Sequence, residues 1–200
     1  MVPSSSRMAC SDCWPDLRSP NLHTNPKGPA TRRAFSFTNI TPMHPPIYHY
    51  TTGDRFLRII GDRAILPATA HVTPPEIPAV WLSSSPVWER SATKGVIENG
   101  VRRQASLTEL VGLCGCLVRI EIDPDRVHLL GPSAYRDALC IPEDVHQRLI
   151  TAGIEMGADP ADWCAVAGPV PLTAFCRIEF TVETKPPHWI PWPGSRPVVR

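Results

Sequence analysis

The strongest chemical signal in the chain is the short run Ile47-Tyr48-His49-Tyr50-Thr51. Its aromatic and β-branched residues predict a strand, and because side chains alternate along a strand, His49 and Thr51 should share one face. A neutral imidazole offers one hydrogen-bond donor and one acceptor near pH 7, which suits recognition of a sugar hydroxyl. A histidine that is simply packed and hydrogen-bonded in a core is the alternative interpretation of the same residue.

Other sequence patterns of enzymes are missing. The chain has no glycine-rich phosphate loop, no His-Glu-x-x-His helix and no Gly-x-Ser-x-Gly turn. The serines at 83–85 lack the flanking glycines of a hydrolase nucleophile. Cys10-x-x-Cys13 would need a second closely spaced pair to form a zinc site, and Cys114-x-Cys116 is a poor candidate because it opens an expected buried strand, so we expect no metal.

The elements that must position His49 form an irregular series of strands and helices. Thr51-Thr52-Gly53-Asp54 resembles a capping box with Thr51 as the cap, and it predicts a helix that Gly61 ends. We expect a short helix at 87–94, with Glu89 and Lys94 in solvent, and a polar loop at 98–104. Further strands are expected at 79–82, at 117–122, where apolar and charged residues alternate, and at 163–166 and 175–182. Further helices are expected over 142–156 and from the capping-box pattern Ser106-Leu107-Thr108-Glu109. This order, without a strand-helix-strand repeat, predicts an α+β fold: a single domain with a split, mostly antiparallel sheet and short helices.

Composition divides the chain into three parts. Residues 1–42 show no hydrophobic period and few acids, so we expect a disordered extension, and Met43, just before the first strand, is our preferred start of translation. Residues 43–185 should form the α+β domain. Residues 186–200 are expected to be a Pro/Trp-rich tail without a pattern.

The run from Ile47 through the following helix to Leu66 resembles the start of ADP-ribosyltransferase domains of the diphtheria-toxin-like, His-Tyr-Glu class. It is most similar to the DNA-thymidine ADP-ribosyltransferase toxins, the DarT group, in which an aromatic-His-x-Thr strand leads into such a helix. The resemblance implies an NAD-dependent ADP-ribosyltransferase or NAD-glycohydrolase that cleaves the nicotinamide–ribose bond. It also implies a toxin or effector role, with NAD as a substrate.

The same resemblance assigns site residues. His49 is expected to hydrogen-bond a ribose hydroxyl of NAD and to be catalytic, and the other expected NAD contacts are Tyr50, Thr51, Trp81 and Ser83. Breaking the nicotinamide–ribose bond passes through an oxocarbenium-like state, which a carboxylate stabilises.

The family carries that carboxylate on a late strand or on the loop before it. Glu179 is our candidate, with Glu121 and Glu183 as alternatives. Surface cross-strand ion pairs with Arg119 and Arg177 would explain Glu121 and Glu179 equally well.

The net charge and the hydropathy of the chain limit the kinds of binding partner that we expect. The net charge of +1 disfavours a large nucleic-acid footprint, and the acceptor, protein or nucleic acid, stays open. No apolar run approaches the roughly 20 residues that a membrane-spanning helix needs, so no membrane partner is expected. The seven cysteines are odd in number and irregularly spaced, which fits free thiols in a reducing compartment and predicts a cytoplasmic protein.

Two other functions remain open at this point. The first is a non-catalytic protein-interaction domain of the same fold, because six tryptophans and a Trp/Pro-rich ending with Trp189 and Trp192 suit an interaction surface. The second is a nuclease or phosphotransferase that combines His49 with His71, His128 or His146, although no spacing supports such a pairing.

Overall fold

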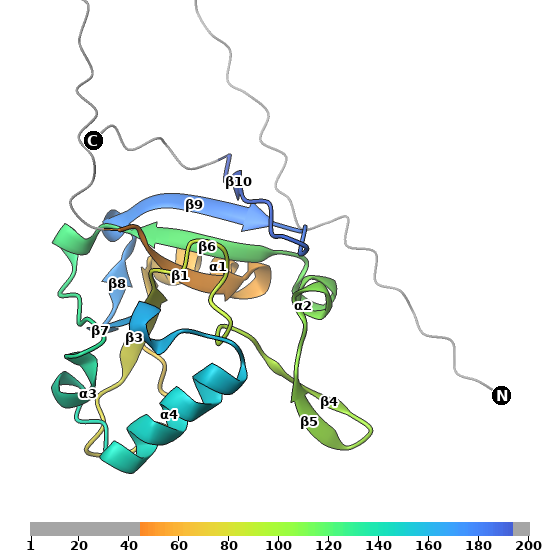
Figure 1. The fold of residues 1–200 in the computed structure, drawn as a ribbon. Helices are drawn as coiled ribbons and strands as arrows, with labels where there is room; N and C mark the ends of the chain where they lie inside the picture. The colour runs from red at the N-terminus through yellow and green to blue at the C-terminus, as the bar shows by residue number, and fades with distance from the viewer. Residues whose placement is uncertain (1–44, 194–200) are drawn as a thin grey trace, which may run out of the picture. The chain divides into compact units, whose positions relative to one another are not determined.

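The computed structural model describes residues 45–193, and its centre is a six-stranded antiparallel sheet in the order β10-β9-β6-β1-β3-β7 (Figure 1). The strands and α-helices, in chain order, are β1 (Ile47–Thr52), α1 (Gly53–Asp62), β2 (Ala64–Ile65), β3 (Ala79–Ser83), β4 (Gly95–Glu98), β5 (Val101–Gln104), α2 (Leu107–Cys114), β6 (Leu117–Ile122), α3 (Tyr135–Ala138), α4 (Glu143–Glu155), β7 (Trp163–Ala167), β8 (Val170–Pro171), β9 (Phe175–Thr181) and β10 (Ile190–Pro191). The predicted α+β class is confirmed. The predicted extension at 1–42, Cys10, Cys13 and residues 194–200 lie outside the described residues.

The sheet is split between β1 and β3. Strand β1 pairs with β6 along its whole length, from Ile47 opposite Ile122 to Thr52 opposite Leu117. It pairs with β3 only where Tyr48 lies opposite Ser83. The two strands part beyond that pair, and β3 continues beside β7 instead. His49 therefore lies at the point where the sheet opens.

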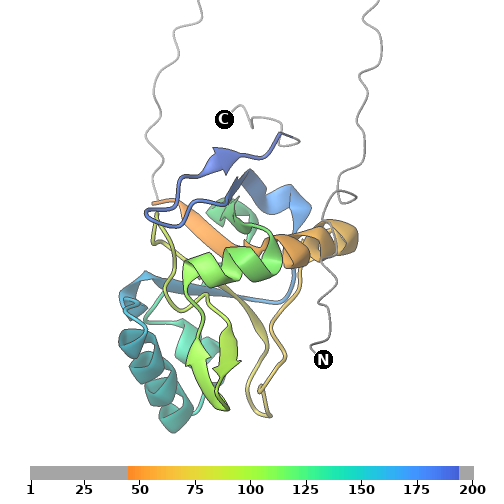
Figure 2. The ribbon, with the colours of Figure 1, turned by 90° about the vertical axis from the view of Figure 1, so that its right-hand side faces the viewer.

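The two faces of the sheet are covered differently, with α1 and α4 on opposite sides (Figures 1 and 2). Helix α1 buries Phe56 and Ile59 against an aliphatic face that includes Ile120. Helix α4 packs through residues such as Leu149 against the opposite face at β3 and β7. Along the β1–β6–β9 half, that second face is aromatic and charged rather than aliphatic.

Helix α1 begins and ends one residue later than expected. The cap is Thr52 rather than Thr51, because the strand pairing with β6 extends through Thr52 and outweighs the local capping signal. The helix also runs through Gly61 to Asp62, and Arg63 takes the left-handed conformation, with φ 57°, that ends it. An exposed glycine with open space around it is tolerated near the end of a helix.

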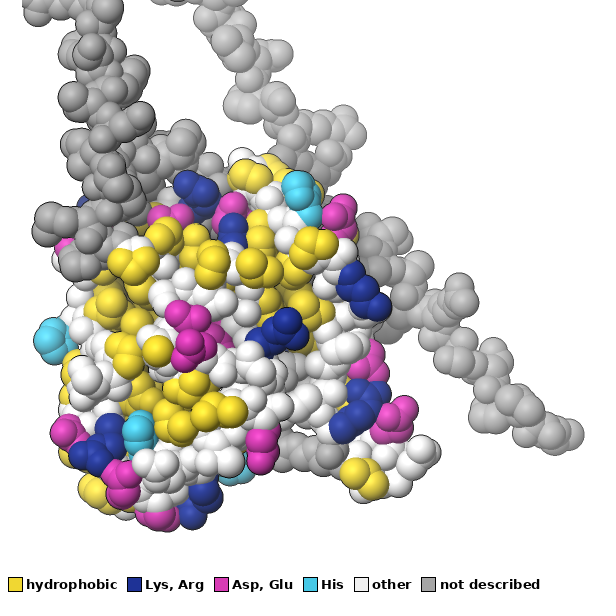
Figure 3. All heavy atoms as spheres, viewed as in Figure 1, with side chains coloured by type: hydrophobic (Ala, Val, Ile, Leu, Met, Phe, Trp, Pro, Cys, Tyr) yellow, Lys and Arg dark blue, Asp and Glu magenta, His cyan; other side chains and the backbone are white. Residues whose placement is uncertain are grey.

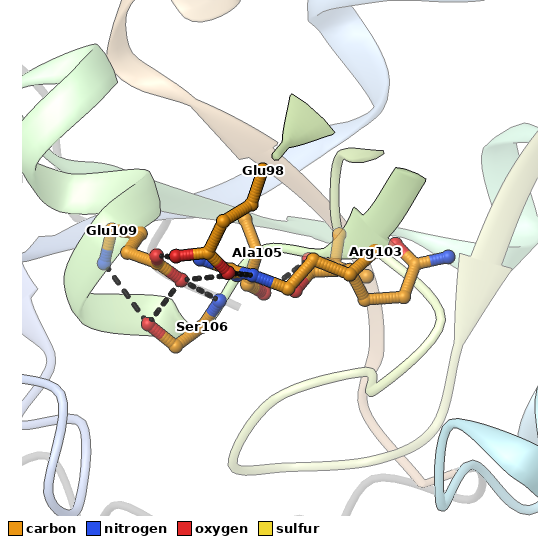
Figure 4. A network of polar contacts seen from close by, with 7 residues as sticks. Glu98, Arg103, Ala105, Ser106 and Glu109 are labelled. Atoms are coloured by element: carbon orange, nitrogen blue, oxygen red, sulfur yellow. Dashed lines mark hydrogen bonds and ion pairs between the residues drawn. The ribbon is translucent and has the colours of Figure 1, made fainter. Parts of the chain in front are cut away.

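Residues 87–104 differ from the prediction. No helix forms at 87–94, and the expected polar loop is a hairpin, β4–β5, whose turn residues Asn99 and Gly100 both have positive φ. Arg103 anchors the hairpin: Nε donates to Glu98 at 2.6 Å, and Nη2 donates to Glu109 at 2.5 Å (Figure 4). Glu109 in turn closes the capping box of α2 with Ser106, as its sequence predicts. The Arg103 guanidinium lowers the pKa of Glu109 to about 2.

The domain extends past residue 185. Strand β10 pairs with β9, with Pro191 opposite Glu179, so at least residues 190–191 of the segment expected to be a patternless tail belong to the sheet. At the other side of the sheet, Leu130 and Ala165 of β7 exchange backbone hydrogen bonds of 2.8 and 2.9 Å. Local sequence patterns do not reveal the role of residues 186–193, because long-range packing and not local periodicity holds this segment in place.

Candidate functional site

His49 is fixed at the opening between β1 and β3. Its Nδ1 lies 3.1 Å from the carbonyl oxygen of Trp81, and because a carbonyl only accepts, Nδ1 carries the proton and donates. Burial, reinforced by the positive charge of Arg55 and opposed by this hydrogen bond, lowers the pKa of His49 below its ordinary value. The ring is therefore neutral at pH 7, and Nε2 holds a lone pair that can accept a hydrogen bond.

Two hollows meet at His49 and share the lining residues His49, Tyr50 and Ala92. The first, the aromatic pocket, has a volume of about 400 Å³ and lies between the sheet and α4. Its lining residues are Tyr48, His49, Tyr50, Trp81, Leu82, Ser83, Glu89, Ser91, Ala92, Leu149, Ala152, Met156 and Trp163. Figure 3 shows mainly hydrophobic side chains over this side of the molecule, with isolated charged ones among them.

The second hollow, the basic pocket, has a volume of about 570 Å³ and is lined by α1, residues 64–70 and residues 92–94. Arg55, Arg58 and Lys94 bring three positive charges to it, and Asp62 brings one negative charge. Neither arginine forms an ion pair with another residue of 45–193. Lys94 is held at the rim, 3.3 Å from the hydroxyl of Thr52 and 3.7 Å from Asp54. Lys94, which we expect in solvent, is therefore only partly exposed, and its ammonium group has protein partners.

Glu89 is the residue that the sequence interpretation missed. We expected it in solvent on a short helix, but it is only 7% exposed and it lines the aromatic pocket. Three donors hold its carboxylate: the Ser83 hydroxyl at 2.7 Å, the Ser91 hydroxyl at 2.7 Å and the Ser91 backbone N–H at 3.0 Å. A buried carboxylate needs such donors to offset its lost hydration. The serines on both sides of Glu89 were the only sequence signal.

Glu179 lies away from His49. In the register of the sheet, Glu179 is opposite Arg119, which is opposite Tyr50, whereas His49 is opposite Ile120. Glu179 is therefore on the other face of the sheet from His49 and two strands away, and it lines neither pocket.

Glu179 has a structural partner in its own neighbourhood. Arg119 Nε donates to its carboxylate at 2.6 Å, with only 12% and 8% of the two side chains exposed. The ion pair is therefore largely buried, unlike the surface pair that we gave as the alternative explanation of Glu179. Glu121 is also buried, with Arg177 at 3.6 Å, while Glu183 is exposed. Neither Glu121 nor Glu183 lines either pocket.

The other expected site residues are gathered around His49. Tyr50, Trp81 and Ser83 line the aromatic pocket, and Thr51 lines the basic pocket. The Tyr50 hydroxyl donates to the carbonyl of Ser85, and burial raises the pKa of Tyr50, so the phenol stays protonated at neutral pH. The N-terminal half of the predicted site is thus brought together, and only its carboxylate is not.

Trp163 closes part of the aromatic pocket and contributes an unusual polar atom. The ring is 4% exposed, and its indole N–H is buried without a hydrogen-bond partner in the described part of the chain. A buried donor of this kind costs about 1–3 kcal/mol unless something accepts from it.

The remaining histidines do not join His49. His146 pairs instead with the hydroxyl of Tyr135 at 3.1 Å, and neither His71 nor His128 lines the two pockets.

Within residues 45–193, no three His, Cys, Asp or Glu side chains are grouped as a metal site would need. None of the described helices has the length and apolar character to cross a membrane. Comparisons with protein-family models, curated proteins and solved structures find no match to this chain.

Proposed function

We propose that the protein cleaves the nicotinamide–ribose bond of NAD, as an ADP-ribosyltransferase or an NAD-glycohydrolase. The observation that carries this proposal is the neutral His49 at the junction of an aromatic pocket that contains Glu89 and a basic pocket that contains Arg55. Such a junction suits an elongated ligand with a flat ring at one end, a sugar in the middle and phosphates at the other.

The pockets match the two ends of NAD in chemistry and size. Volumes of about 400 and 570 Å³ are typical of small-molecule sites. Aromatic walls suit a flat nicotinamide ring, and its carboxamide oxygen is a suitable acceptor for the buried indole N–H of Trp163, which has no acceptor among the described residues. The guanidinium groups of Arg55 and Arg58, which have no ion-pair partner within 45–193, suit a diphosphate, which they bind through charge-assisted hydrogen bonds.

The chemistry assigns a role to each polar side chain. Nε2 of His49 accepts a hydrogen bond from a ribose hydroxyl and so holds the sugar in place. When the C–N bond breaks, its electron pair leaves with nicotinamide, and positive charge develops on the ribose. Glu89 stabilises that charge, and it accepts the proton that the attacking acceptor group or water loses. In this proposal Glu89 replaces Glu179 as the catalytic carboxylate.

The biological setting is part of the same proposal. Free cysteines support a cytoplasmic location, where NAD is abundant, and consumption of NAD or modification of a macromolecule supports a toxin or effector role. A protein or a nucleic acid is the acceptor in the transferase form of the proposal.

The test follows nicotinamide release by the full-length protein and measures NAD binding by calorimetry. We expect His49→Ala and Glu89→Gln each to lower release by at least about 100-fold. Glu183→Gln, an exposed carboxylate that lines neither pocket, is the matched control and should leave release unchanged. A wild-type protein that neither binds NAD nor releases nicotinamide would overturn the proposal.

The alternative of a non-catalytic interaction domain loses its main support. Trp189 and Trp192, which suggested an interaction surface, both pack against the sheet instead of projecting from it. Trp192 contacts Phe56 at 5.2 Å between ring centroids, and Trp189 stacks on Trp88 at 6.4 Å.

A further inference from the structure

The loop that precedes Glu89 is held by side chains at four successive backbone carbonyls. Tyr50 donates to the carbonyl of Ser85, and Arg119 Nη1 donates to the carbonyl of Pro86. Trp189 Nε1 donates to the carbonyl of Val87 at 2.9 Å, and the Ser85 hydroxyl donates to the carbonyl of Trp88 at 3.3 Å. We call these four contacts the carbonyl clamp.

Three of the four donors of the clamp come from distant parts of the chain, and the fourth, Ser85, is in the loop itself. Tyr50 is on β1, Arg119 is on β6, and Trp189 immediately precedes β10. The loop itself forms neither helix nor strand, so its backbone conformation depends on these side chains. Glu89 follows the last clamped carbonyl directly, which means that the clamp sets where the carboxylate enters the aromatic pocket.

Arg119 and Trp189 also support each other. The Arg119 guanidinium lies 4.7 Å from the ring centroid of Trp189 and 4.9 Å from that of Tyr48. Trp189 stacks on Trp88 with an interplanar angle of 12°. The carboxylate of Glu179 also holds Arg119, because it accepts a hydrogen bond of 2.6 Å from Arg119 Nε. Removing one donor should therefore increase the mobility of the whole loop, and not only break one hydrogen bond.

We propose that Arg119 and Trp189, with Glu179 acting through Arg119, are positioning residues that set the carboxylate of Glu89 in the aromatic pocket. This inference rests on the proposed function, in which Glu89 is the catalytic carboxylate. A catalytic group must be held within a fraction of an ångström of its working position, and small misplacements lower kcat strongly. None of the three positioning residues lines the pocket, so their loss should act on kcat and leave KM for NAD almost unchanged.

The test uses full-length variants with two independent readouts. Trp189→Phe keeps the stacked ring but removes the N–H that donates to Val87, and Glu179→Gln removes the charge that holds Arg119. Trp192→Ala is the matched control, because Trp192 lies on the same segment but packs on Phe56 and Phe180, away from the loop. The readouts are hydrogen exchange of the backbone amides of 85–92 and the kcat and KM of nicotinamide release.

We expect Trp189→Phe to lower the protection of the 85–92 amides by about fivefold, the effect of one lost hydrogen bond. Trp189→Phe and Glu179→Gln should each lower kcat at least tenfold with KM nearly constant. Trp192→Ala should change neither loop protection nor kcat. The positioning role would be overturned if Trp189→Phe left the protection of the 85–92 amides unchanged. It would also be overturned if Trp192→Ala lowered that protection and kcat as much as Trp189→Phe does.

The two readouts also separate this inference from the proposed function. If the wild-type protein neither binds NAD nor releases nicotinamide, the proposed function fails, and the catalytic role of the clamp fails with it. If the wild-type protein is active and both variants keep the wild-type kcat, only the positioning role is overturned.

Discussion

Replacing Gly153 with alanine should destabilise the protein, although glycine is a poor helix former. Gly153 is inside α4, and a Cβ atom built on it would lie 2.3 and 2.4 Å from Cη2 and Cζ2 of Trp163. Those distances are far below van der Waals contact, and the buried indole is too rigid to bend away. The ring would have to shift, and it lines the aromatic pocket.

The expected magnitude follows from two opposing effects. Alanine is favoured over glycine in a helix interior by about 1 kcal/mol. Overpacking a close-packed core costs about 1–3 kcal/mol, and a contact with two atoms of a rigid ring belongs at the upper end. The net loss in the free energy of unfolding should therefore be about 1–2 kcal/mol. Gly112→Ala is the matched control: it is in α2, exposed, with nothing within 4 Å of the added Cβ, so it should gain about 0.5–1 kcal/mol.

Thermal unfolding followed by circular dichroism measures both variants. For a domain of this size, 1 kcal/mol corresponds to a shift in Tm of about 2–4 °C, so the two substitutions should move Tm in opposite directions. Under the proposed function, Gly153→Ala should also weaken NAD binding, because the displaced ring of Trp163 lines the aromatic pocket. If Gly153→Ala stabilises the protein as much as Gly112→Ala does, the packing of α4 against Trp163 described above is refuted.

Three further predictions concern stability. Glu179→Leu should cost about 3 kcal/mol in urea unfolding, because it leaves the Arg119 charge buried without its main partner; a loss below about 1 kcal/mol would indicate an ordinary exposed pair. Because the pKa of His49 is lowered in the folded state, the unfolded chain binds a proton first as pH falls below about 6.5, so stability should fall with a slope approaching 1.4 kcal/mol per pH unit. His49→Gln should lack that slope in pH-dependent unfolding, and an identical pH dependence in both proteins would contradict the assignment. Ser106→Ala should cost about 1 kcal/mol in thermal unfolding, whereas Ser106→Asp, which can still cap α2, should cost much less.

The sequence predicts best where local and tertiary preferences agree. The strand at Ile47, the alternation in 117–122 and the capping box at Ser106 all appear as expected. The capping box is satisfied within four residues, and the two strands pair with distant strands in a way that agrees with their local pattern. At Thr51 the two preferences conflict, and pairing with β6 moves the cap by one residue.

The position of the pocket carboxylate, Glu89, could not be predicted from local sequence patterns. Glu179 has the strand alternation of a candidate, but which neighbour faces it depends on the order of the strands. Glu89 has no periodic pattern, because its loop is shaped by donors from β1, β6 and the segment before β10. A site assembled from such distant residues becomes visible only once the topology is known.

The edges of the sheet affect how other protein chains can bind to this one. An open edge offers unpaired N–H and C=O groups to which a foreign strand can add. Here the outermost strand on one side is only two residues long, and one of them is Pro191, which has no N–H to donate. On the other side, Leu130 occupies backbone groups of β7 at Ala165. Both features reduce the length of open edge along which a foreign strand could pair, although β9 and β7 are each covered over only part of their length.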